Sequence, residues 1–173
     1  AANWDWFSEL IKKAGRPIKL LNLFAYTGGA SIAAAKAGAF VCHVDASKGM
    51  VARAKLNAQL SGVRQEGIRY IVDDCFKFVR REQRRGNKYD AIIMDPPSYG
   101  RGPKGELWKI EESIFPFIKL TSEILSDDAL FFLVNSYTTG LQPAVLSYMI
   151  NLAIVDKFGG NVTASEIGLP VKD

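Results

Sequence analysis

The chain has 173 residues, of which 48% are hydrophobic and 23% are charged, a composition typical of one globular domain. Its two cysteines and one histidine are too few for a four-ligand zinc site of the usual kind. No apolar run reaches the roughly 18 residues of a membrane-spanning helix. We therefore expect a cytoplasmic protein with no metal and no membrane contact. The net charge of +4 permits a nucleic-acid partner but does not by itself indicate one.

Segments typical of buried strands alternate with segments typical of helices. In chain order the expected elements are strand 18–24, helix 30–36, strand 40–44, a helix between Ser47 and Gly62, strand 68–72, helix 76–85, strand 89–94, helix 107–125, strand 129–134, helix 143–155 and strand 161–167. Pro116 is expected to bend or interrupt the helix that contains it, because proline lacks the backbone N–H that a helix interior needs.

This alternation predicts the fold class. Strands that are apolar throughout and separated by helices are typical of an α/β protein with a mostly parallel, doubly wound, Rossmann-like sheet covered by helices on both faces. The sequence contains no repeat and no low-complexity linker. We expect residues 1–173 to form a single domain.

Ligands of such sheets bind beyond the carboxyl ends of the strands, so the residues at those ends are candidates for a site. A glycine-containing turn, residues 25–30, follows the first expected strand, and its glycines allow a ligand to approach the backbone closely. Asp45 ends the second strand, where a carboxylate can accept hydrogen bonds from both hydroxyls of a ribose. Asp73 and Asp74 follow the third strand, and Asp95 follows the fourth. Together they predict a nucleoside pocket.

Different interpretations of these residues stay open. Any single aspartate at such a position can simply cap a helix or form a turn. The turn does not have the spacing G-x-G-x-x-G of dinucleotide-binding proteins, and the lysine of a phosphate-binding loop is replaced by Glu106. His43 lies within a strand and is expected to be structural.

Five segments in the same order resemble the class I S-adenosylmethionine-dependent methyltransferases, in the version found in bacterial rRNA large-subunit methyltransferases. These segments are residues 21–29, 43–47, 57–62, 73–76 and 95–100. The resemblance covers almost the whole chain. It implies S-adenosylmethionine as the cofactor and RNA, rRNA in particular, as the partner that is methylated on a base.

The resemblance also implies roles for individual residues. The turn would hold the methionine part of the cofactor, Asp45 the ribose, and Asp74 the exocyclic amine of adenine, with the backbone of Cys75 facing the adenine ring. The implied cofactor-binding set is Ala25, Tyr26, Thr27, Gly28, Gly29, Ala30, Asp45, Ala46, Ser47, Asp74, Cys75, Phe76 and Asp95. The implied catalytic set, between the cofactor and the acceptor base, is Asp95, Pro96, Pro97 and Tyr99.

The resemblance does not fix the reaction mechanism. Members of the family that methylate cytosine C5 use a cysteine in the loop after the fifth strand, but here residues 135–140 contain none. Direct in-line transfer is therefore expected, with cytosine-C5 methylation as an alternative. Tyr99 could stack on a base or pack on its own domain. Two further interpretations of the whole chain stay open, a non-catalytic RNA-binding module and a nicotinamide-dinucleotide-binding domain.

Two further features concern partners and length. A basic cluster of Arg80, Arg81, Arg84, Arg85 and Lys88 is interpreted either as the solvated end of a helix or as a patch that contacts phosphates. The seventh strand of the family is expected to follow Asp173. In members of the family, an RNA-binding or small β domain often precedes the segment that corresponds to the one beginning at Trp4 here. The chain is therefore expected to be a catalytic domain from a longer protein.

Overall fold

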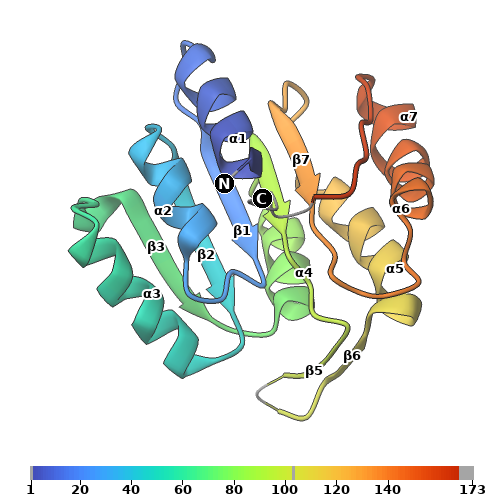
Figure 1. Ribbon diagram of the computed structural model, residues 1–173, viewed down its shortest axis with the longest axis horizontal. Coiled ribbons are helices and arrows are strands. Elements are labelled where there is room, and N and C mark those ends of the chain that lie inside the picture. The colour runs from blue at the N-terminus through green and yellow to red at the C-terminus, as the bar shows by residue number, and fades with distance from the viewer. Residues whose placement is uncertain (1, 103, 168–173) are drawn as a thin grey trace, which may run out of the picture.

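The computed structural model describes residues 2–102 and 104–167. Its centre is a sheet of five parallel strands in the order β3-β2-β1-β4-β7 (Figure 1). The strands are β1 (Lys19–Leu23), β2 (Phe40–Asp45), β3 (Ile68–Val72), β4 (Ala91–Met94) and β7 (Phe131–Val134). The predicted α/β class and parallel sheet are confirmed.

Helices cover both faces of this sheet. The helices α1 (Ala2–Lys13), α2 (Gly29–Lys36) and α3 (Lys48–Leu60) pack on one face, and α4 (Cys75–Arg85), α5 (Ile110–Ser122) and α6 (Pro143–Ile150) pack on the other. Neighbouring strand residues point to opposite faces. Leu20 therefore packs with Phe7 of α1, whereas Leu21 packs in the cluster that contains Ile114 of α5. Strands buried on both sides explain the continuous apolar runs in the sequence.

The helix ends follow local signals in the sequence. The Ser47 hydroxyl caps α3 by accepting a hydrogen bond from the Met50 N–H at 3.3 Å. The Asp74 carboxylate caps α4 by accepting one from the Lys77 N–H at 2.9 Å. Gly86 ends α4 with a φ of 69°, a conformation that glycine adopts without strain.

The strand order reverses between β1 and β4. The β1 strand pairs with β2 on one side and with β4 on the other, so the crossovers that follow these strands diverge. Such a reversal opens a crevice at the carboxyl ends of the strands, where ligands of doubly wound sheets bind. The glycine turn after β1 and Asp95 after β4 both lie at this crevice.

A hairpin that the sequence analysis did not predict stands beyond this edge of the sheet. Residues 107–109, which were expected to be helical, form β6 (Leu107–Lys109) and pair antiparallel with β5 (Tyr99–Arg101). The helix begins only at Ile110. Since Trp108 donates a hydrogen bond from its Nε1 to the Pro97 carbonyl at 2.7 Å, tertiary contacts hold this segment extended.

The structure also shows no interruption of a helix at Pro116 and no strand at residues 161–167. The helix α5 runs through Pro116 without interruption, because Pro116 faces solvent while Ile114, Phe117 and Ile118 on the opposite side are fully buried. Residues 161–167 form no strand and are nearly all exposed, so the strand expected there is absent. The remaining elements are the helical turns η1 (Gln65–Gly67), η2 (Asn151–Val155) and α7 (Asp156–Phe158).

Some expectations were incomplete or fall outside the described part. The helix α1 was not predicted, although Phe7 and Ile11 have the spacing of one buried helix face. The seventh strand expected after Asp173 lies outside the described residues. Among residues 2–102 and 104–167, no helix combines the length and apolar character needed to cross a membrane.

Candidate active site

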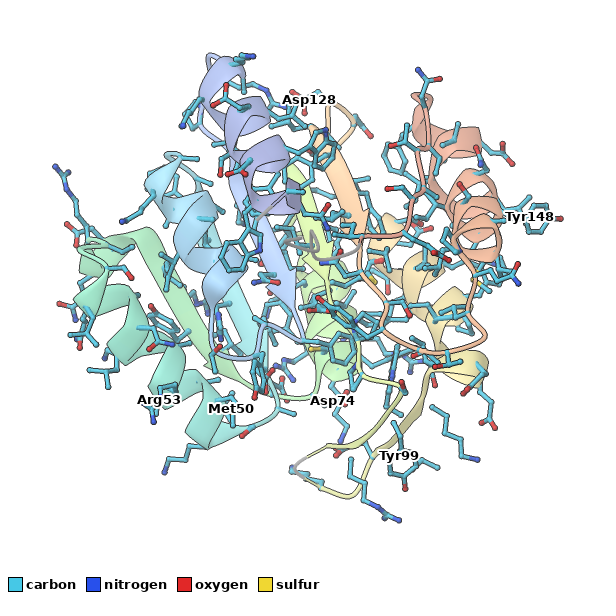
Figure 2. All side chains as sticks on the ribbon, viewed as in Figure 1. Met50, Arg53, Asp74, Tyr99, Asp128 and Tyr148 are labelled. Atoms are coloured by element: carbon cyan, nitrogen blue, oxygen red, sulfur yellow. The ribbon has the colours of Figure 1, made fainter. Side chains whose placement is uncertain are left out.

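A pocket of about 450 Å³ lies at the carboxyl edge of the sheet, and several loops contribute to it. Its volume is within the usual range for small-molecule sites, about 300–1,000 Å³. The residues that line it are Phe24, Tyr26, Asp45, Ala46, Ser47, Asp74, Cys75, Asp95, Pro96, Pro97, Ser98, Gly100, Arg101, Gly102, Trp108 and Tyr137. Asp74 is labelled at this edge in Figure 2.

The turn after β1 has an unusual backbone. Phe24 and Tyr26 have φ values of 53° and 50°, which non-glycine residues rarely adopt, and Gly28 has a φ of 86°. The Gly28 N–H donates to the Ala25 carbonyl at 3.0 Å, and the Ala25 N–H donates to the Val44 carbonyl of β2 at 3.1 Å. These bonds fold the turn tightly between β1 and α2. The turn thereby brings the side chains of Phe24 and Tyr26 to the pocket.

Asp45 connects two of the loops that form the pocket. One carboxylate oxygen accepts a hydrogen bond from the Tyr26 N–H at 2.9 Å, and the other accepts one from the Ser47 N–H at 2.8 Å. A carboxylate has about four lone-pair sites, so acceptor capacity remains for a ligand. The half-buried Asp45 side chain also lines the pocket.

Asp74 and Cys75 form the wall of the pocket next to β3. Asp74 caps α4 with one oxygen and also lines the pocket, so the capping and ligand-binding interpretations of the sequence do not exclude each other at this residue. The Cys75 thiol is fully buried and accepts a hydrogen bond from the Phe24 N–H at 3.3 Å. It therefore fixes the beginning of the turn to α4.

Asp95, Pro96 and Pro97 form the opposite part of the pocket, after β4. The Asp95 N–H donates to the Leu23 carbonyl at 3.3 Å, which holds this segment against the end of β1. Burial raises the pKa of the Asp95 carboxyl above its usual range. A carboxylate with a raised pKa at a strand end in a pocket is a candidate for accepting a proton or a hydrogen bond from a substrate.

The structure brings together most of the predicted site residues, but not all of them. Of the predicted residues, Tyr26, Asp45, Ala46, Ser47, Asp74, Cys75, Asp95, Pro96 and Pro97 line the pocket. The others, which do not line it, are Ala25, Thr27, Gly28, Gly29, Ala30, Phe76 and Tyr99. Tyr99 lies in β5, paired with Lys109, and projects from the hairpin below the sheet in Figure 2.

A second group of lining residues was not predicted from the sequence. Arg101 and Trp108 come from the hairpin, and Tyr137 comes from the loop after β7. The Trp108 ring packs against Phe24 with centroids 4.9 Å apart, so the hairpin is fixed to the turn after β1. Glycines at 100, 102 and 105 between two aromatic residues were a usable signal of a hairpin.

Comparison with known proteins identifies the family. A family model of S-adenosylmethionine-dependent methyltransferases matches residues 4–113, which include the turn after β1 and the segments that end in Asp45, Asp74 and Asp95. The chain belongs to this family. S-adenosylmethionine is accordingly the cofactor of the family to which the chain belongs. The interpretation as a nicotinamide-dinucleotide-binding domain is excluded. The predicted resemblance is confirmed.

Relatives of this methyltransferase-family chain include proteins named ribosomal RNA large subunit methyltransferase I. The one from Aeromonas salmonicida is 40% identical over 92 residues, which are 53% of this chain and 23% of the relative. The one from Photobacterium profundum is 39% identical over 82 residues, which are 47% of this chain and 21% of the relative. The matched segment thus spans less than a quarter of the length of these curated relatives.

Solved structures show the same fold. A methyltransferase from Agrobacterium tumefaciens is 41% identical, with a TM-score of 0.86 over 88% of this chain and 49% of that chain. The protein SMU.776, solved in complex with S-adenosylhomocysteine, is 27% identical, with a TM-score of 0.73 over 90% of this chain and 39% of that one.

The basic cluster of this methyltransferase-family chain is mostly engaged within the molecule. Arg81 forms an ion pair with Asp73, and Arg85 lies 3.4 Å from Glu82. The Lys88 ammonium donates to the Glu123 carbonyl at 2.6 Å. The helix α4 begins at the pocket and runs antiparallel to the strands β3 and β4, which it connects. The end that carries Arg84 and Arg85 therefore lies toward the opposite edge of the sheet. These contacts favour the interpretation as a helix end.

Proposed function

We propose that the chain is the catalytic domain of an RNA methyltransferase that transfers a methyl group from S-adenosylmethionine directly to a base, with rRNA as the RNA. The observation that carries this proposal is the arrangement of the pocket. Residues after β1, β2 and β3 form one side, suited to a nucleoside cofactor, and the Asp95 segment after β4 lies next to it. The names of the curated relatives support RNA as the substrate. An rRNA substrate would place the protein in the cytoplasm.

The residues of the cofactor side fit S-adenosylmethionine. Asp45 has acceptor capacity for the ribose hydroxyls, and the second oxygen of Asp74 can accept from the adenine amine. The tight turn of residues 25–30, which reaches the pocket through Tyr26, would hold the methionine part, while Ala46 supports the adenine side. When bound, the cofactor supplies a methyl group on a positively charged sulfur, which needs orientation rather than activation.

The residues of the acceptor side would orient the base. Asp95 would accept a hydrogen bond from an exocyclic amine of the base and keep the lone pair of that nitrogen in line with the methyl group. Its raised pKa suits it to take up the proton that the methylated nitrogen releases. Pro96 and Pro97 restrict the backbone of this segment, and Trp108 fixes it by donating to the Pro97 carbonyl.

The two cysteines support direct transfer over a covalent mechanism. Burial raises the pKa of the Cys42 thiol to about 11 and raises that of Cys75 further. Both thiols are therefore protonated near neutral pH, and a thiol must lose its proton to attack a base. The Cys75 sulfur is in addition directed at the Phe24 N–H.

Calorimetry and a transfer assay on the full-length protein test the proposal. We expect S-adenosylhomocysteine to bind, and radiolabelled S-adenosylmethionine to label large-subunit rRNA from a strain that lacks the gene. Binding without transfer to any RNA from that strain would favour a non-catalytic RNA-binding module. Absence of binding to the folded protein would overturn the assignment of the pocket.

A further inference from the structure

The strand order separates the pocket into a cofactor side and a second side. Neighbouring strands of a sheet lie roughly 4.8 Å apart, so β7 is about 14 Å from β2, three strands away. Tyr137 follows β7 and lines the pocket. It is therefore placed on the side of Asp95, away from Asp45 and Asp74. Nothing in the mechanism above uses it.

The loop that carries Tyr137 is fixed on both sides of this residue. The Asn135 N–H donates to the Met94 carbonyl at 2.9 Å, and the Asn135 side chain accepts from Asn3 at 2.7 Å. On the other side, the Thr138 hydroxyl lies 2.7 Å from the Ser98 hydroxyl. These contacts bind the loop to the segment that follows Asp95. They leave little backbone freedom to lose when a ligand binds.

The Tyr137 side chain is nevertheless 85% exposed at the pocket. A large aromatic ring gains free energy when it is covered, so an exposed ring on a fixed backbone is suited to bind a planar ligand. Tyr99, the aromatic residue singled out from the sequence, does not line the pocket. The position of Tyr137 beside the Asp95 segment indicates a ring that stacks on the acceptor base rather than on adenine.

The hairpin provides a cation at the same pocket. Arg101 of β5 is exposed and lines the pocket together with Gly100 and Gly102. Glu106 of the same hairpin forms an ion pair with Lys77 of α4. The arginine is therefore held at the pocket on an anchored element, where its planar guanidinium suits a phosphate group.

We propose that Tyr137 and Arg101 form the subsite for the acceptor nucleotide: Tyr137 stacks on the unpaired base that is methylated, and Arg101 contacts a phosphate next to it. The inference rests on the proposed function and specifies the substrate as an unstacked nucleotide of RNA. Single-stranded segments expose the base faces that such a ring can cover.

Variants at Tyr137 test the stacking part in the full-length protein. From the usual strength of base stacking, Tyr137→Ala should lower kcat/KM for large-subunit rRNA from the deletion strain by about 10- to 100-fold. Tyr137→Phe should keep nearly all activity, and the affinity for S-adenosylhomocysteine should stay unchanged in both. The control is Tyr148→Ala, since Tyr148 is exposed on α6 and projects away from the sheet in Figure 2.

Each outcome decides the question. Equal kcat/KM for wild type and Tyr137→Ala would overturn the stacking role while leaving the proposed function intact. A parallel loss of S-adenosylhomocysteine affinity would assign Tyr137 to the cofactor instead. A wild-type protein that methylates no RNA would overturn the proposed function and this inference together.

The salt dependence of RNA binding tests Arg101. Each phosphate contact adds about one unit to the slope of log affinity against log salt, so Arg101→Gln should reduce the slope by about one. The matched control is Arg84→Gln, an exposed arginine at the far end of α4. If Arg84→Gln lowers the slope and Arg101→Gln does not, RNA follows α4 and the proposed subsite is wrong.

Discussion

Asp45 accepts a hydrogen bond from the Tyr26 N–H at 2.9 Å, which joins the end of β2 to the turn after β1. Tyr26 has a φ of 50°, so this bond stabilises a backbone conformation that a non-glycine residue avoids. Asp45, which is proposed to bind the ribose, thus also shapes the turn. Changes at Asp45 should affect both the ligand and the turn.

We predict that Asp45→Ala weakens binding of S-adenosylhomocysteine by about 1–3 kcal/mol, because hydrogen bonds to a charged group are lost. Asp45→Asn should lose less, since its amide oxygen can still accept one of the two backbone N–H groups. Calorimetry on both variants measures the difference. An unchanged affinity in Asp45→Ala would reject the ribose role.

A second prediction concerns Gly28, which has a φ of 86°. A Cβ at this position would lie 3.0 Å from the Cβ of Ala54 in α3. Gly28→Ala should therefore cost both backbone strain and a steric displacement, about 1–3 kcal/mol of the free energy of unfolding.

Gly62→Ala is the matched control for Gly28→Ala. Gly62 has a φ of 72°, but nothing lies within 4 Å of the added Cβ. The control should therefore show the backbone strain alone and leave cofactor affinity unchanged. Urea unfolding and calorimetry compare the two variants. Equal losses of stability would argue against close packing of α3 under the turn.

Much of the site could be predicted because parallel strands place their ends together. Asp45, Asp74 and Asp95 follow three such strands, so their shared position follows from the order of elements in the sequence. The hairpin was missed because strands of three residues are too short to show periodicity. Tyr137 was missed because its exposure depends on the contacts of Asn135 and Thr138 with distant residues.

The prediction of a strand at residues 161–167 was wrong for a related reason. The segment contains Val162 and Thr163, which favour strands, but a strand needs a neighbour that accepts its backbone hydrogen bonds. No described strand pairs with these residues. Local propensity alone could not reveal this.

The buried His43 should make stability depend on pH. It lies below the turn, where its Nδ1 is hydrogen-bonded to the Ser31 hydroxyl at 2.9 Å. Burial lowers the pKa of His43 to about 4. The unfolded chain has the ordinary value of 6.5, so between pH 6.5 and 4 only the unfolded state binds the proton. Stability from this residue therefore falls as pH falls through that window.

A His43→Gln variant checks this effect, because the chain has a single histidine. Between pH 7 and pH 5, wild type should lose about 1–2 kcal/mol more stability than His43→Gln. Urea unfolding at both pH values gives the two differences. Identical pH dependence would mean that His43 titrates in the folded state as it does in the unfolded chain.

The direct-transfer mechanism predicts no covalent adduct with RNA. Cys42 and Cys75 are both buried, with raised pKa values, so neither can attack the C6 atom of cytosine. RNA that contains 5-fluorocytosine should therefore not be trapped on denaturing gels. A stable complex mapped to either cysteine would restore cytosine-C5 methylation as the reaction.

The last prediction concerns Asp95, the carboxylate on the acceptor side. If Asp95 aligns the accepting nitrogen, Asp95→Ala should lower methyl transfer by about 10²-fold or more, with a much smaller effect on S-adenosylhomocysteine affinity. Because burial raises the pKa of Asp95, activity should also rise with pH as this carboxyl ionises, and Asp95→Asn should remove that rise.

The contribution of Asp95 to the free energy of unfolding should change with pH in the opposite direction. Between the unfolded and the raised folded pKa, the folded state holds the proton, so stability falls as pH rises through this window. Transfer rates and unfolding curves for wild type and Asp95→Asn between pH 4 and pH 7 measure both trends, and an acidic limb that persists in Asp95→Asn would assign the titration to another group.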